Sequence, residues 1–104
     1  MTSFKQELFG PVASIIPARD AAHALALAND SEFGLAATIY TRNVQLAEQM
    51  VDQLETGGEF INGYCASDPL ATFRGVKKSG FGRELSLVGV RNFCHAQTVW
   101  LDQH

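Results

Sequence analysis

A carboxylate and an aromatic ring lie close together near the start of the chain. Glu7 and Phe9 are two residues apart, and a Gly-Pro turn and the apolar run Val12–Ile16 follow directly. A carboxylate can accept hydrogen bonds from both hydroxyls of a ribose, and a phenyl ring can pack beside a flat heterocycle. On composition alone, a turn with a packed phenylalanine is the commoner interpretation.

A second segment with chemical potential is Ser79–Glu84, where a Gly-x-Gly sequence precedes an expected helix. Such a loop can bring backbone N–H groups up to a phosphate. The third glycine of a dinucleotide fingerprint is missing, and the loop does not directly follow a strand. A flexible entry into a helix is therefore the favoured interpretation.

The cysteines and histidines give no sign of a metal site or a disulfide framework. Cys65 and Cys94 lack CxxC spacing, and the three histidines lack i, i+4 spacing. Cys65 invites a nucleophile hypothesis, but no motif marks an activating base. Both cysteines are expected to be reduced thiols in a cytosol.

Composition narrows the class of protein. The 104 residues suffice for one small domain, and 46% are hydrophobic, enough for a core. Only 18% are charged, against about 25% in typical soluble domains, which suggests that some apolar surface meets a partner. The net charge of −3 and the lack of a basic run argue against nucleic acid and anionic membranes. No apolar stretch approaches the roughly 20 residues of a membrane helix, so we expect a cytoplasmic protein.

The elements that must position these residues form an α/β pattern. Short apolar runs predict strands at 12–16, 35–41 and 60–62. Between them, Asp20 and Thr41 or Asn43 begin two helices with apolar stripes. Connections of about 18 residues predict right-handed parallel crossovers, and hence a small three-stranded parallel βαβαβ layer. Such a thin sheet is expected to be part of something larger or to be completed by another chain.

The rest of the chain begins with a long loop, 63–82, and loops of this length are usually functional. A helix over 83–92 and a last strand over 96–101 follow.

Four segments, in this order, resemble motifs of the NAD(P)-dependent aldehyde dehydrogenases. They are Glu7–Val12, Asn29–Leu35, Phe60–Gly63 and Gly75–Glu84. The resemblance runs from Phe4 to Asp102, and Asn62–Asp68 is most similar to the bacterial succinate-semialdehyde dehydrogenases.

The resemblance implies that residues 1–104 form the C-terminal part of an aldehyde dehydrogenase catalytic domain. It would end in an oligomerisation strand at about 95–102. The cofactor domain, the Gly-Gln-x-Cys nucleophile motif and the general-base glutamate do not occur in this sequence. We therefore expect no catalytic residue, no bound NAD or NADP and no activity in this chain alone. The expected partners are further copies of the chain and the upstream dehydrogenase region.

Site residues follow from the same resemblance. Glu7 corresponds to the glutamate that binds the nicotinamide ribose, and Phe9 to the aromatic residue beside the nicotinamide. Ser67 and Phe73 fall in the loop that lines the aldehyde tunnel, where a serine like Ser67 helps to hold the substrate carboxylate. An alternative function is a stand-alone, truncated protein that acts as a non-catalytic self-associating or interaction module.

Two residues depart from the family pattern. Arg74 replaces an expected glycine, so its side chain could crowd the tunnel wall or alter the backbone. Glu59 replaces an apolar strand residue, and a buried, unpaired carboxylate would be costly. Our hypothesis is that Glu59 faces solvent or has a partner.

Overall fold

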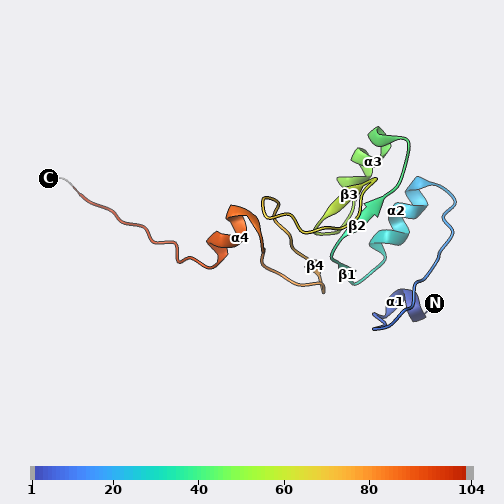
Figure 1. Cartoon of the computed structure of the whole chain (residues 1–104), viewed down its shortest axis with the longest axis horizontal. Coiled ribbons are helices and arrows are strands. Elements are labelled where there is room, and N and C mark those ends of the chain that lie inside the picture. The colour runs from blue at the N-terminus through green and yellow to red at the C-terminus, as the bar shows by residue number, and fades with distance from the viewer. Residues whose placement is uncertain (1, 103–104) are drawn as a thin grey trace.

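The structure is a computed structural model that describes residues 2–102. Its elements, in chain order, are α1 (Thr2–Lys5), α2 (Ala21–Asn29), β1 (Phe33–Gly34), β2 (Ala37–Ile39), α3 (Val44–Val51), β3 (Glu59–Ile61), β4 (Val76–Lys77) and α4 (Ser86–Asn92). The elements up to β4 gather at one end of the molecule. From there α4 and the extended C-terminal tail lead away (Figure 1), and the chain measures 69 × 34 × 23 Å.

Both predicted internal helices are confirmed, together with the residues that begin them. The Asp20 carboxylate accepts a hydrogen bond from the His23 backbone N–H at 2.7 Å and caps α2. The Asn43 side chain does the same for the Leu46 N–H at 3.1 Å and caps α3. Each cap satisfies a backbone donor that the first helical turn leaves unpaired.

Two short sheets are present in the part of the chain that the structure describes. Strands β2 and β3 pair in parallel, with Ala37 opposite Glu59, and α3 forms the crossover between them. This pair confirms the expected parallel connection. The second sheet is antiparallel and joins β1 to β4, with Gly34 opposite Val76. The sequence did not indicate this pairing, because β4 lies within the predicted long loop.

The expected three-stranded parallel layer is not confirmed. Residues 12–16 are extended but form no strand, and Ile15 is 91% exposed. The expected final strand over 96–101 is likewise an extended tail. A strand exists only where a neighbour pairs its backbone N–H and C=O groups. No segment within residues 2–102 lies in register with either stretch.

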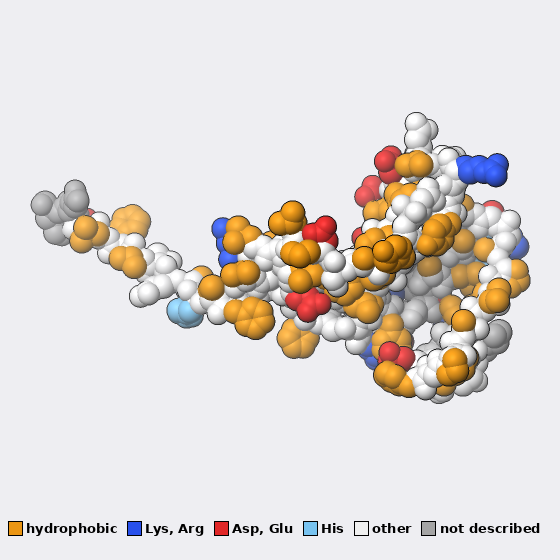
Figure 2. Space-filling model, in the orientation of Figure 1, with side chains coloured by type: hydrophobic (Ala, Val, Ile, Leu, Met, Phe, Trp, Pro, Cys, Tyr) orange, Lys and Arg blue, Asp and Glu red, His pale blue; other side chains and the backbone are white. Residues whose placement is uncertain are grey.

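The chain has little core of its own. Ala47 is the one fully buried hydrophobic side chain among the described residues. The solvent-accessible surface of the chain is 8557 Å². A compact monomer of 11.3 kDa would expose about 5,700 Å². The radius of gyration, 18.3 Å, also exceeds the roughly 13 Å of a compact domain of this length. Hydrophobic side chains are spread along the whole visible face (Figure 2).

Among residues 2–102, no helix has both the length and the apolar character needed to cross a membrane.

Candidate functional site

A groove of about 560 Å³ lies beside β3, and we call it the β3 groove. Ser67 and Phe73, the two residues expected to face a substrate tunnel, both line it. The structure therefore brings these two predicted site residues together, although they are six positions apart in a loop without regular structure. The remaining lining residues are Gly58, Glu59, Phe60, Gly63, Tyr64, Ala66, Asp68, Ala71 and Thr72.

Asn62 fixes the point where the Ser67 loop leaves β3. Its side-chain carbonyl accepts a hydrogen bond from the Thr41 backbone N–H at 2.8 Å. Its amide nitrogen donates to the Thr41 carbonyl at 2.9 Å. Asn62 has a φ of +54°, a left-handed conformation that asparagine tolerates better than most residues. This double hydrogen bond ties the start of the loop to the end of β2.

Further along, local hydrogen bonds shape the loop. The Asp68 carboxylate accepts from the Leu70 N–H at 2.8 Å, and the Asp68 carbonyl accepts from the Ala71 N–H at 3.1 Å. The Pro69 carbonyl accepts from the Ser86 N–H at 2.9 Å and so joins the loop to the start of α4. Ser67 therefore lies between two anchored points and is itself exposed to solvent.

Phe73 is held by an antiparallel bridge to Glu84. The two backbones exchange both N–H···O=C hydrogen bonds at 2.9 Å. The phenyl ring is half-buried and passes over Gly58, where an added Cβ would lie 3.5 Å from the nearest ring atom. A residue larger than glycine at position 58 would thus meet the Phe73 ring.

Glu59 confirms the hypothesis that its carboxylate has a partner. The side chain is half-buried at the groove wall, and the Thr56 hydroxyl donates to its Oε1 at 2.8 Å. This hydrogen bond compensates in part for the loss of water around the carboxylate.

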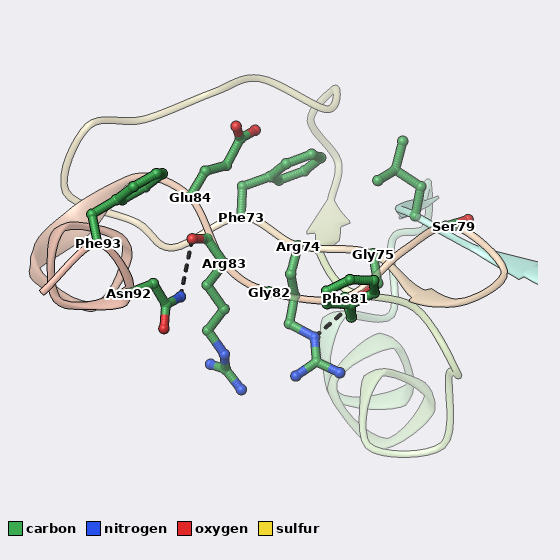
Figure 3. Close-up of a pocket in the computed structure, with 11 residues that line it drawn as sticks. Phe73, Arg74, Gly75, Ser79, Phe81, Gly82, Arg83, Glu84, Asn92 and Phe93 are labelled. Atoms are coloured by element: carbon green, nitrogen blue, oxygen red, sulfur yellow. Dashed lines mark hydrogen bonds between the residues drawn. The ribbon is translucent and has the colours of Figure 1, made fainter. Parts of the chain in front are cut away.

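Arg74 lies outside the β3 groove, so its side chain does not crowd that wall. Instead it lines a second hollow, of about 420 Å³, which Phe73 also lines (Figure 3). Its backbone carbonyl lies so close to Gly57 that any Cβ there would overlap it. Arg83, Asn92 and Phe93 line the same hollow, and sequence reasoning did not identify them as site residues.

The two residues expected at the cofactor are not brought together. Glu7 lines a hollow of about 430 Å³ beside α1, α2 and β1, whereas Phe9 lines none of the three hollows and is 94% exposed. The Glu7 carboxylate has no hydrogen bond or ion pair within residues 2–102, so its oxygens are available to hydroxyl groups. The Glu7 carboxylate, which accepts no hydrogen bond within residues 2–102, has the chemistry to accept hydrogen bonds from the hydroxyls of a ribose. The exposed Phe9 ring is accessible to a flat heterocycle.

Two cysteines are among the described residues. Cys65 and Cys94 are both exposed free thiols, and Cys65 does not line the β3 groove. Within residues 2–102, no group of three histidine, cysteine or acidic side chains is placed to hold a metal ion.

Comparison with known proteins gives a consistent picture. The sequence profile of the aldehyde dehydrogenase family matches residues 1–99. Over 103 residues the chain is 64% identical to a succinate semialdehyde dehydrogenase of Escherichia coli K12, named as using NAD(P)+. It is 44% identical over 101 residues to an NADP+ succinate-semialdehyde dehydrogenase of Mycobacterium avium. These matches cover 99% and 97% of this chain but only 22% and 21% of the relatives, so the chain spans about a fifth of their length.

Solved structures agree. A succinic semialdehyde dehydrogenase from Streptococcus pyogenes, in complex with NADP+, superposes with a TM-score of 0.89 at 38% identity, covering 96% of this chain and 22% of that one. An NAD+ complex of an aldehyde dehydrogenase from Bacillus cereus gives a TM-score of 0.93 at 36% identity, covering 98% and 21%. This chain belongs to the aldehyde dehydrogenase family.

Proposed function

We propose that residues 1–104 act as the C-terminal part of a succinate-semialdehyde dehydrogenase. The whole enzyme would convert an aldehyde, NAD(P)+ and water into a carboxylic acid, NAD(P)H and one proton. This part would supply one wall of the aldehyde tunnel, one contact to the cofactor and a surface for assembly. The matches to succinate-semialdehyde dehydrogenases over almost the whole chain support the choice of substrate.

The observation that carries this proposal is the β3 groove, which Ser67 and Phe73 line together. In our proposal the Ser67 hydroxyl donates one hydrogen bond to the distal carboxylate of the semialdehyde, while Phe73 packs against its short aliphatic chain. One hydroxyl cannot neutralise a carboxylate, so the full charge would be met by residues outside this chain. Tyr64 and Thr72 are further candidates for contact with the substrate, because they line the same groove.

The residues available for the cofactor are Glu7 and Phe9. We infer that the Glu7 carboxylate accepts hydrogen bonds from the nicotinamide ribose of NAD or NADP and that the Phe9 ring packs beside the nicotinamide. The cofactor supplies a hydride acceptor when it is bound. The free carboxylate of Glu7 and the exposed ring of Phe9 support these roles.

The chain by itself is proposed to be inactive, because the family's nucleophile and base motifs do not occur in it. We expect the purified 104-residue chain to produce no NAD(P)H from succinate semialdehyde. Mixing it with a polypeptide that corresponds to the preceding four fifths of the Escherichia coli relative is expected to give turnover. NAD(P)H production that follows the purified chain alone would refute the first expectation, and a mixture that forms a complex but has no activity would refute the second.

A second candidate function is a non-catalytic module that associates with further copies of itself. It is favoured by about 2,800 Å² of surface in excess of a compact monomer, which exceeds what a standard protein interface buries. In either case we propose that the extended residues 12–16 and about 95–102 become strands by pairing with another polypeptide. Sedimentation at micromolar concentration tests this, since a mass of one chain argues against self-association.

We propose a cytoplasmic location for this protein, in which the free thiols of Cys65 and Cys94 stay reduced.

A further inference from the structure

Arg74 and Arg83 occupy facing positions on two antiparallel segments. Phe73 and Glu84 form the hydrogen-bonded bridge, so the next residues on each segment, Arg74 and Arg83, stand across from each other. Successive side chains of an extended segment point to opposite sides. Figure 3 shows this alternation: both arginine side chains extend to one side of the bridge, and Phe73 and Glu84 extend to the other.

Within residues 2–102, neither guanidinium group forms an ion pair. The three ion pairs among residues 2–102 all involve lysines. Arg74 uses only its Nε, which donates to the Gly75 carbonyl at 3.3 Å, and the Arg83 side chain has no hydrogen-bond partner within the described residues. Glu84 is the one acidic residue in the lining of this hollow, and its carboxylate points away from the arginines (Figure 3).

Like charges that face each other across paired strands are unfavourable unless something compensates them. Here both arginines line one hollow of about 420 Å³. The backbone that carries them is fixed by the Phe73–Glu84 hydrogen bonds and by the Asn92 side chain, whose amide donates to the Arg83 carbonyl at 3.1 Å. The backbone that carries the two charges is thus fixed by contacts that do not involve the guanidinium groups.

We propose that Arg74 and Arg83 form a binding site for a small oxyanion, a carboxylate or a phosphate group. Planar guanidinium groups donate paired hydrogen bonds to the oxygens of such anions, and two of them can hold one anion between them. The ring of Phe81, which lines the same hollow and is exposed, offers an apolar surface to the rest of the ligand. Neither arginine lines the β3 groove, and the site does not depend on the proposed reaction.

The test uses the 15N-labelled 104-residue chain and follows the Nε–Hε signals of its arginines by NMR. Inorganic phosphate is added in one series and succinate in another, each at constant ionic strength set with chloride. The signals of Arg74 and Arg83 are expected to move together and to saturate. The anion that binds with the lower Kd then identifies the ligand group as a phosphate or a carboxylate.

Variants of the two arginines test whether the changes in the Nε–Hε signals arise from binding at this site. Arg74→Gln and Arg83→Gln are each expected to weaken binding by about tenfold or more, because each removes a charged donor pair. Arg74→Lys keeps the charge but loses the paired geometry, so an intermediate loss is expected. The exposed Arg42, on the connection before α3, provides the matched control, and Arg42→Gln is expected to bind like the original chain.

Backbone amide spectra show whether each variant keeps its fold. If Arg74→Gln does not fold, Arg74→Lys is used in its place. The proposal is overturned if the shifts are linear and equal for all arginines in both series, which is what an adventitious ion would give. It is also overturned if a folded Arg74→Gln or Arg74→Lys variant binds as tightly as the original chain. Neither outcome depends on turnover, so the result is independent of the complementation experiment above.

Discussion

Replacement of Asn62 tests whether the anchor of the Ser67 loop works as its geometry indicates. The Asn62 side chain makes two hydrogen bonds with the Thr41 backbone, at 2.8 and 2.9 Å, and its own backbone has a φ of +54°. Asn62→Gly removes both bonds and keeps a backbone that tolerates this φ. Since each bond contributes about 0.5–1.5 kcal/mol and the residue is exposed, the expected loss is about 1–2 kcal/mol.

Asn62→Ala removes the same bonds but, unlike the glycine variant, keeps a Cβ in the left-handed region, which costs about 1–2 kcal/mol relative to glycine. The free energy of unfolding is measured by urea titration, followed by far-ultraviolet circular dichroism. Gln45→Ala, an exposed side chain on α3 without a hydrogen bond, serves as the control and is expected to shift stability by less than about 0.5 kcal/mol. The reasoning is refuted if the glycine variant is as stable as the original chain, or if the alanine and glycine variants are equally destabilised.

Three further predictions address other parts of the chain. Asp20→Ala removes the cap of α2 and is expected to cost about 1 kcal/mol in the same urea assay, whereas Asp20→Asn, which keeps an acceptor, costs less. Gly57→Ala places a Cβ into the Arg74 carbonyl and is expected to abolish the β3 groove, which would appear in NMR spectra as loss of the dispersed amide signals of Phe60 and Phe73. Gly10→Ala, where a Cβ meets nothing within 4 Å, is the control. Equal spectra for the two variants would contradict the close approach of Gly57 to Arg74. In the complemented enzyme, which is this chain mixed with the preceding four fifths of the Escherichia coli relative, Glu7→Gln is expected to raise KM for NAD(P)+ about tenfold. Glu48→Gln on α3 is expected to leave this KM unchanged. An unchanged KM for Glu7→Gln would contradict the proposed contact between Glu7 and the ribose.

The parts of the fold that the sequence predicted are those with local causes. Asp20 and Asn43 cap their helices through hydrogen bonds to residues three positions ahead, so the signal lies in a few neighbouring residues. The parallel pairing of β2 with β3 followed from the length of the connection and the helix within it. Local chemistry thus sufficed for the βαβ unit.

The parts that the sequence did not predict depend on contacts between distant residues. The β1–β4 pair joins Gly34 to Val76 across more than forty residues, and β4 has only two residues, too few for a periodic pattern. The expected strands at 12–16 and 96–101 have suitable residues but no neighbour within residues 2–102.

For the site, the resemblance placed Ser67 and Phe73 in one loop, and the structure adds that they share a groove. The facing position of Arg74 and Arg83 required knowledge of the Phe73–Glu84 bridge. A β-bridge in an irregular loop leaves no periodic signal in the sequence, so this pair could be found only in three dimensions.

The most direct test of the account is the substrate preference of Ser67→Ala in the complemented enzyme. Steady-state kinetics are measured with succinate semialdehyde and with butanal, an aldehyde of the same chain length without the carboxylate. Cys65→Ala, two positions before Ser67 in the same loop, serves as the control. We predict that Ser67→Ala raises KM for succinate semialdehyde about tenfold, through loss of one hydrogen bond to a charged group, and leaves KM for butanal unchanged. Equal effects on both aldehydes, or none on either, would contradict the claim that the β3 groove holds the substrate carboxylate.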